Sequence, residues 1–263
     1  MKKFAFLVAF LAMILGCSSE NKTQTIKIGA TAGPHADVVE AVAREAKNHG
    51  IDIKVVEFSD YITPNQSLAD GELDMVSYQH EPFLNNFNAQ RKTNLKNIGR
   101  TILMRMGIYS DKFSSLNNLP QNAVVAIPND PTNEGRALVL LQKAGLITLK
   151  AGLGFKATLS DIENNPKNLQ FLELEAAQLP RSLSDADIAV ITMNYVYSAG
   201  LDVAKTGLFF ESDDEPLAVM ILAVRGEDEK SETYQKIAKF FGSKSVKDYI
   251  EKTYKGTITS AIK

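Results

Sequence analysis

Cysteine and histidine are scarce in this chain of 263 residues, which contains one cysteine and three histidines. A single cysteine excludes an intrachain disulfide, so the folded part must be stabilised by its core alone. The histidines, His35, His49 and His80, are dispersed, and none pairs with another at the spacing of a metal site. We therefore expect neither a resident metal ion nor another cofactor.

Blocks of one charge are also absent. The formal net charge is −2, and no basic run indicates a nucleic-acid partner. The composition, 44% hydrophobic and 23% charged, is that of an ordinary folded protein.

No apolar run is long enough to span a bilayer as a helix, and the run Phe4–Leu15 near the start of the chain is also too short. Two lysines precede this run, and Cys17 follows Ile14-Leu15-Gly16, the arrangement of a bacterial lipoprotein signal. A buried structural cysteine is the alternative interpretation of Cys17. We predict a signal peptide over 1–16, lipidation of Cys17 and a polar tether over 17–24, so that a lipid holds the protein to a membrane.

Beyond the tether, strand and helix patterns alternate along the chain. "TIKIGAT" predicts a strand, "GPHADVVEAVAREAKNHG" a helix and "IDIKVVEF" a second strand, which together form a parallel crossover unit. The same alternation recurs to the end of the chain and predicts an α/β fold. There are too many elements for one compact sheet, so we predict two lobes, although a single large doubly wound sheet is an alternative.

Two long apolar strands, around 102–109 and 217–225, are the natural places for the chain to cross between lobes. The first lobe would then comprise 25–106 with 225–263, and the second 107–224. The two crossing segments would form a hinge with the ligand cleft between the lobes.

Catalytic motifs are missing. The chain has neither a G-x-S-x-G nucleophile elbow nor a P-loop, and "IGATAGPH" departs from the dinucleotide fingerprint. The acidic run "ESDDEP" (211–216) fits a cation site or, more commonly, a solvated loop. We expect no enzyme, although a hydrolase or transferase on a two-lobed fold is one alternative, and an adhesin or structural lipoprotein that binds no small ligand is another.

Candidate binding residues follow the predicted strands of the first lobe. Tyr61 lies in "SDYITPN", and Tyr78, His80 and Phe83 lie in "YQHEPF". Open α/β sheets bind ligands at the carboxyl ends of their strands, so these side chains would form an apolar pocket with one polar group. Taken singly, each of these residues could instead have only a packing role in the core or on the surface.

In the second lobe, Asp130 is a predicted N-cap, Pro131 the first helical residue, and Arg136 lies in the second helical turn. A ligand carboxylate bound bidentately by the guanidinium and by the helix amides would explain an arginine at this end of a helix. A salt bridge to Glu134 or another carboxylate is the alternative. Asn194 in "ITMNYVY" follows another strand.

The run "PNDPTNEGRALVLLQKAGLITLK", with "DIENNPKNLQFLELEAAQLPRSL", "DYITPN" and "YQHEPF", resembles the methionine-binding lipoprotein family (MetQ/NlpA type) of ABC importers. The resemblance covers almost the whole chain. It implies a two-lobed periplasmic-binding-protein fold, type II-like, that closes on methionine or a related amino acid. By position, the family's ligand contacts fall on Tyr61, Tyr78, His80, Phe83, Arg136 and Asn194. Many relatives have a second asparagine where this chain has Met220.

The resemblance also implies partners and a location. A monomeric carrier would be anchored by lipid in the bacterial cell envelope, facing the periplasm or the exterior, and would deliver its ligand to a membrane permease and its ATPase. Arg136 would bind the carboxylate, Asn194 the amino acid head group, and the aromatic residues with Met220 an apolar side chain. A short methionine-containing peptide or another apolar amino acid is the alternative ligand.

Overall fold

The computed structural model describes residues 25–262. The predicted signal peptide, Cys17 and the tether lie outside these residues. Within 25–262, no helix combines the length and the apolar character needed to cross a bilayer.

The first lobe is built on a six-stranded sheet in the order β13-β4-β12-β3-β1-β2. β1 pairs in parallel with β2 and β3, as the crossover pattern predicted, whereas β12 is antiparallel to both β3 and β4. The strands are β1 (Ile26–Thr31), β2 (Ile53–Phe58), β3 (Met75–His80), β4 (Leu95–Met104), β12 (Val219–Arg225) and β13 (Ile258–Ser260). The helices of this lobe are α1 (Pro34–Lys47), α2 (Thr63–Ala69), α3 (Glu81–Arg91), α8 (Glu232–Phe240) and α9 (Lys244–Tyr254).

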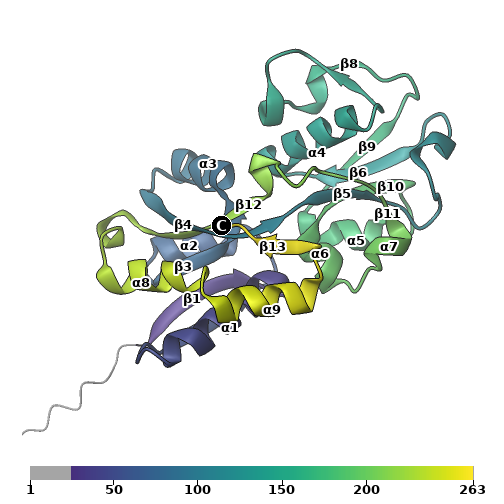
Figure 1. Cartoon of the computed structure of the whole chain (residues 1–263). Helices are drawn as coiled ribbons and strands as arrows, with labels where there is room; N and C mark the ends of the chain where they lie inside the picture. The colour runs from purple at the N-terminus through teal and green to yellow at the C-terminus, as the bar shows by residue number, and fades with distance from the viewer. Residues whose placement is uncertain (1–24, 263) are drawn as a thin grey trace, which may run out of the picture.

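The second lobe is built on a five-stranded sheet in the order β11-β5-β10-β6-β9. β6 pairs in parallel with β9 and β10, and β5 is antiparallel to β10 and β11. The strands are β5 (Met106–Tyr109), β6 (Val124–Pro128), β9 (Gln170–Leu174), β10 (Ile188–Thr192) and β11 (Gly207–Phe210), with a separate pair of β7 (Thr148–Leu149) and β8 (Ile162–Asn164). The helices are α4 (Pro131–Lys143), α5 (Leu179–Ser182), α6 (Met193–Ser198) and α7 (Val203–Thr206). Figure 1 shows the two sheets in separate lobes, so the alternative of one large sheet is wrong.

The chain crosses between the sheets twice. Arg105 separates β4 from β5, so the first crossing lies inside the long strand where it was expected. The chain returns between Phe210 and Val219. All of β12 hydrogen-bonds to strands of the first sheet, so by strand pairing the second boundary falls before Val219 and not at residue 224.

The hydrophobic core continues through the junction of the lobes. One buried cluster contains Ile28 and Met75 of the first sheet together with Ala126 and Ile191 of the second. The C-terminal segment also contacts both lobes. The Tyr254 hydroxyl donates to the Asp37 carboxylate on α1 at 3.1 Å, and Thr257 is hydrogen-bonded to Tyr197 of α6 at 2.7 Å. The two lobes therefore pack against each other at this junction.

Candidate functional site

A cavity lies between the two lobes, beside the crossing segments. All seven residues predicted to bind ligand line it, although they come from both lobes and span some 160 positions of sequence. The full lining is His35, Tyr61, Tyr78, Gln79, His80, Phe83, Met104, Asn133, Arg136, Thr192, Met193, Asn194 and Met220. Whether each one contacts a ligand stays a prediction.

The aromatic wall comes from the first lobe. Phe83 meets Tyr61 and Tyr78 edge-on, with ring centroids 6.3 Å and 6.1 Å away, in the geometry that aromatic pairs prefer. The Tyr78 hydroxyl donates to the carbonyl of Tyr61 at 2.9 Å, and the Tyr61 hydroxyl lies 2.9 Å from that of Thr192 in the second lobe. Burial raises the pKa of both tyrosines well above the ordinary value, so both stay neutral. The wall is apolar, with its hydroxyls engaged by protein partners.

His80 ends β3 and caps helix α3. Its Nδ1 accepts the amide of Phe83 at 3.2 Å, so the proton of the neutral ring lies on Nε2, which donates to Oδ1 of Asn133 at 3.2 Å. Burial, with a further contribution from nearby Arg136, lowers the pKa of His80 to about 3. Both ring nitrogens therefore have protein partners. His80 links the lobes as well as lining the cavity.

Arg136 is buried and paired. Its Nε and Nη2 donate to the two carboxylate oxygens of Glu211 at 2.7 Å and 2.6 Å, and Nη2 also donates to the carbonyl of Met104 at 3.0 Å. The partner is Glu211 and not Glu134, which accepts the amide of Leu159 instead. This bidentate pair occupies the edge of the guanidinium formed by Nε and Nη2. Nη1 alone has no hydrogen-bond partner among residues 25–262.

The start of helix α4 is also engaged by its own residues. Asp130 is the N-cap and Pro131 the first helical residue, as predicted. The Asp130 carboxylate accepts the backbone amide of Asn133 at 3.0 Å and its side-chain amide at 2.9 Å. The amide of Asn133 is thus not available for the helix-terminus half of the expected anion site.

Glu211 was missed as a single residue, because the acidic run 211–216 was interpreted as a whole. Glu211 is 4% exposed and also accepts the backbone amide of Met106 at 2.6 Å. The pair with Arg136 therefore joins α4 to both crossing segments. Asp213 in the same run is exposed and pairs with Arg105. No signal in the sequence separates the buried acid from its exposed neighbours.

Asn194 lies in the first turn of α6, directly after β10, so it follows a strand as predicted. Its Nδ2 donates to the carbonyl of Ala32 at 3.1 Å, and its Oδ1 accepts the amide of His35 at 3.4 Å. Both ends of the side-chain amide therefore bind the start of α1, across the cleft. Asn194 holds the lobes together at the cavity wall.

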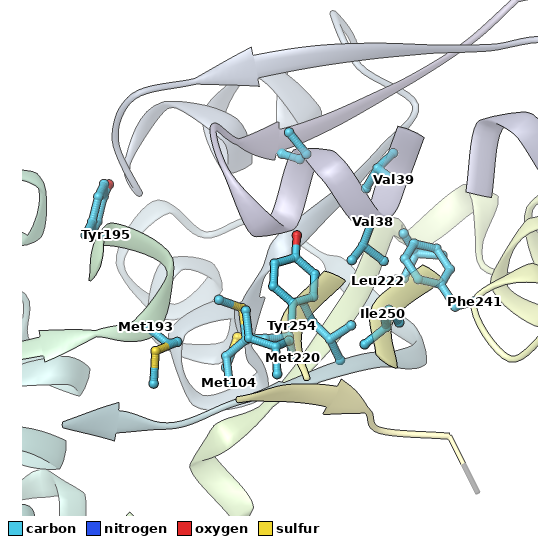
Figure 2. Close-up of a cluster of buried hydrophobic side chains, with 14 of the residues drawn as sticks. Val38, Val39, Met104, Met193, Tyr195, Met220, Leu222, Phe241, Ile250 and Tyr254 are labelled. Atoms are coloured by element: carbon cyan, nitrogen blue, oxygen red, sulfur yellow. The ribbon is translucent and has the colours of Figure 1, made fainter. Parts of the chain in front are cut away.

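Met220 lies beside His80 on the adjacent strand, because the two residues are register partners of β12 and β3. Met104 and Met193 line the same cavity, and Figure 2 shows the three thioether side chains in one buried cluster beside α1. Met104 and Met193 were not predicted, since methionines at strand ends are ordinary core residues by pattern. The cavity is thus lined by thioether as well as aromatic side chains.

Two lobes with central sheets, two crossing segments and a cavity between them define a substrate-binding protein of the periplasmic type. The chain belongs to the NlpA lipoprotein family, whose model matches residues 26–262, as its motifs indicated.

Relatives named for methionine share most of this chain. A D-methionine-binding lipoprotein MetQ of Escherichia coli O157:H7 is 40% identical over 254 residues, which cover 95% of this chain and 93% of that protein. Among solved structures, a nutrient binding protein from Burkholderia cenocepacia bound to methionine is 44% identical, covers 90% of this chain and 100% of its own, and superposes with a TM-score of 0.88. The methionine binding protein MetQ is 39% identical over 91% of this chain and 98% of its own, with a TM-score of 0.87. The named relatives are binding proteins and not enzymes.

Proposed function

We propose that this protein is the lipid-anchored substrate-binding component of an ABC importer and that it binds methionine or a closely related amino acid. The observation that carries the proposal is the lining of one cavity, which combines aromatic and thioether side chains with a guanidinium nitrogen that has no partner among residues 25–262. The names of the relatives support the same ligand class.

The carboxylate of the ligand would bind Nη1 of Arg136. The pair with Glu211 restricts this contact to one nitrogen and orients the guanidinium, so the bidentate contact expected from the sequence gives way to a single charge-assisted hydrogen bond.

The side chain of the ligand would lie between the rings of Tyr61 and Phe83 and the thioethers of Met193 and Met220. Burying a side chain of methionine's size contributes about 1.5–3 kcal/mol, and sulfur against aromatic rings adds roughly 0.3–1.5 kcal/mol.

Closure would bury the ligand, and release would require the lobes to part. The hydrogen bonds of Tyr61 with Thr192, of His80 with Asn133 and of Asn194 with Ala32 cross the cleft at the cavity and would break on opening. The crossings at Arg105 and at 211–218 are the segments around which such a motion would turn. Docking to a permease and its ATPase would follow closure, with the binding protein as a monomer.

The ligand is tested by native mass spectrometry of protein purified without refolding, followed by titration calorimetry with L-methionine, D-methionine and a methionine-containing dipeptide. We expect one bound amino acid per chain and tighter binding of a free methionine than of the dipeptide. Tighter binding of the dipeptide would show that the ligand is a peptide and not a free amino acid. If neither method detects a bound small molecule, the proposed function is wrong.

The anchor is tested separately. Cys17→Ser should remove the site of acylation and move the protein from the membrane fraction to the soluble fraction of cells that process lipoproteins. Retention of this variant in the membrane fraction would contradict lipidation at Cys17.

A further inference from the structure

Nearly every polar side chain that lines the cavity already has a protein partner. The amides of Gln79 and Asn65 hydrogen-bond to each other in both directions at 2.7 Å. The remaining tyrosine, threonine, asparagine and His80 groups are engaged as described above. Apart from Nη1 of Arg136, the exception among residues 25–262 is the ring of His35, whose Nδ1 is buried without a hydrogen-bond partner.

The position of His35 is set by the start of α1. Gly33 precedes the helix at φ +92°, a conformation that favours glycine, and a Cβ there would meet Oγ of Ser198 at 2.3 Å. The amide of His35 donates to Asn194 of the second lobe. The backbone of His35 is thereby held against the opposite lobe, and its ring lines the cavity.

The ring of His35 can accept a hydrogen bond. His35 is 2% exposed, and burial lowers its pKa to about 3, so the ring is neutral and one nitrogen carries a lone pair. A buried polar atom without a partner costs free energy that a ligand regains by supplying the partner.

The charges of the lining indicate what that partner is. Of the described residues that line the cavity, none is Asp or Glu, so no carboxylate is present to receive a ligand ammonium group. Arg136 meets the carboxylate end of an amino acid, and the amino end requires an acceptor. Both amide ends of Asn194, the residue expected to serve the head group, are already bound to α1.

We infer that His35 is a specificity-determining residue whose ring nitrogen accepts a hydrogen bond from the α-amino group of the bound amino acid. The inference rests on the proposed function and assigns the amino end of the ligand to α1 of the first lobe, opposite the arginine of the second. A ligand that lacks the amino group would leave this nitrogen unpaired.

The test is a cycle of two proteins and two ligands, measured by titration calorimetry. The ligands are methionine, in the enantiomer that the wild-type protein binds more tightly, and 4-(methylthio)butanoate, which is methionine without its α-amino group. His35→Phe should weaken methionine binding by about 10- to 100-fold, the range for a hydrogen bond to a charged group, and the binding of the analogue by less than about threefold. His49→Phe is the matched control, because His49 lies outside the cavity and its side chain is 44% exposed. It should change neither affinity.

His35→Gln, which keeps an acceptor, should recover part of the loss. A measurement on the wild-type protein covers the case in which His35→Phe does not fold. The ¹⁵N chemical shift of His35 Nδ1 or Nε2 should move when methionine is added and should stay in place with the analogue.

Equal losses for the two ligands in His35→Phe, or equal ¹⁵N shifts, would overturn the role of His35 while leaving the proposed function intact. A wild-type protein that binds no methionine would overturn both.

Discussion

The two walls of the cavity are built differently. The aromatic part of the first lobe's wall is made by residues close in sequence: Tyr61 follows β2, Tyr78 and His80 end β3, and Phe83 is in the first turn of α3. The wall from the second lobe depends on partners far apart in the chain, because Arg136 is oriented by Glu211, 75 residues away. The first wall supplies shape through apolar packing, and the second supplies charge through a buried ion pair. Substitutions that remove a charged group should therefore have large effects on ligand affinity or on the free energy of unfolding. Substitutions that change only the shape of the apolar wall should have small ones.

Removing the guanidinium should have the largest effect on binding. Arg136→Ala would leave the ligand carboxylate without its charged partner in a closed cavity, so we expect methionine binding to weaken by about 3–5 kcal/mol. Titration calorimetry measures this loss. Unchanged affinity in a folded variant would show that Arg136 serves only the ion pair with Glu211.

Removing the acid that orients the arginine should affect folding first. Glu211→Gln leaves the Arg136 guanidinium buried without its counter-charge, and we expect the free energy of unfolding to fall by about 3 kcal/mol in urea denaturation. Asp213→Asn is the matched control from the same acidic run. It removes an exposed pair with Arg105, so a loss of at most about 1 kcal/mol is expected. Equal losses in the two variants would refute the distinction between the buried and the exposed acid.

The histidines of the cavity should make stability depend on pH. The pKa of His80 is about 3 in the folded protein and about 6.5 when the chain is unfolded, so between these values the unfolded state binds the extra proton. The free energy of unfolding is therefore highest above pH 6.5 and decreases as the pH falls toward 3. At pH 5, His80 alone should lower it by about 2 kcal/mol. His35 should contribute similarly.

His80→Asn removes the titrating ring and keeps a residue suited to cap α3. The difference in unfolding free energy between pH 7.5 and pH 5 should be smaller in this variant than in the wild-type protein. An unchanged difference would show that His80 does not titrate between the two states.

The smallest effect should come from the aromatic wall. Phe83→Leu keeps apolar area but removes the ring, so methionine should lose roughly 0.3–1.5 kcal/mol of binding free energy, and norleucine, which has no sulfur, should lose less. Calorimetry with both ligands measures the difference. Equal losses would mean that the ring contributes area and not a specific contact with sulfur.

Much of the fold could be predicted from the sequence, because alternating strand and helix patterns are local. The parallel crossover at the start, the cap at Asp130 and the crossing near Arg105 all depend on residues near one another in the chain. The short strands β7, β8, β11 and β13 were not predicted, since a strand of two to four residues carries too little periodicity. The sequence analysis assigned most of β12 to the second lobe, but the strand belongs to the first sheet. Only its pairing with β3 and β4 shows this.

The site, like the fold, has features that local sequence predicts and features that depend on contacts between distant residues. The sequence by itself determined which side chains gather at the ends of strands, because a parallel sheet brings those ends to one edge. The tertiary structure decided which of their polar atoms remain for a ligand. Glu211 takes one edge of Arg136, and α1 takes the amide of Asn194. A hydrogen-bonding group buried in a closed cavity binds whichever partner the fold brings within reach, and that partner can come from any distance along the chain. His35, an isolated histidine by sequence, is left as the acceptor by these same contacts.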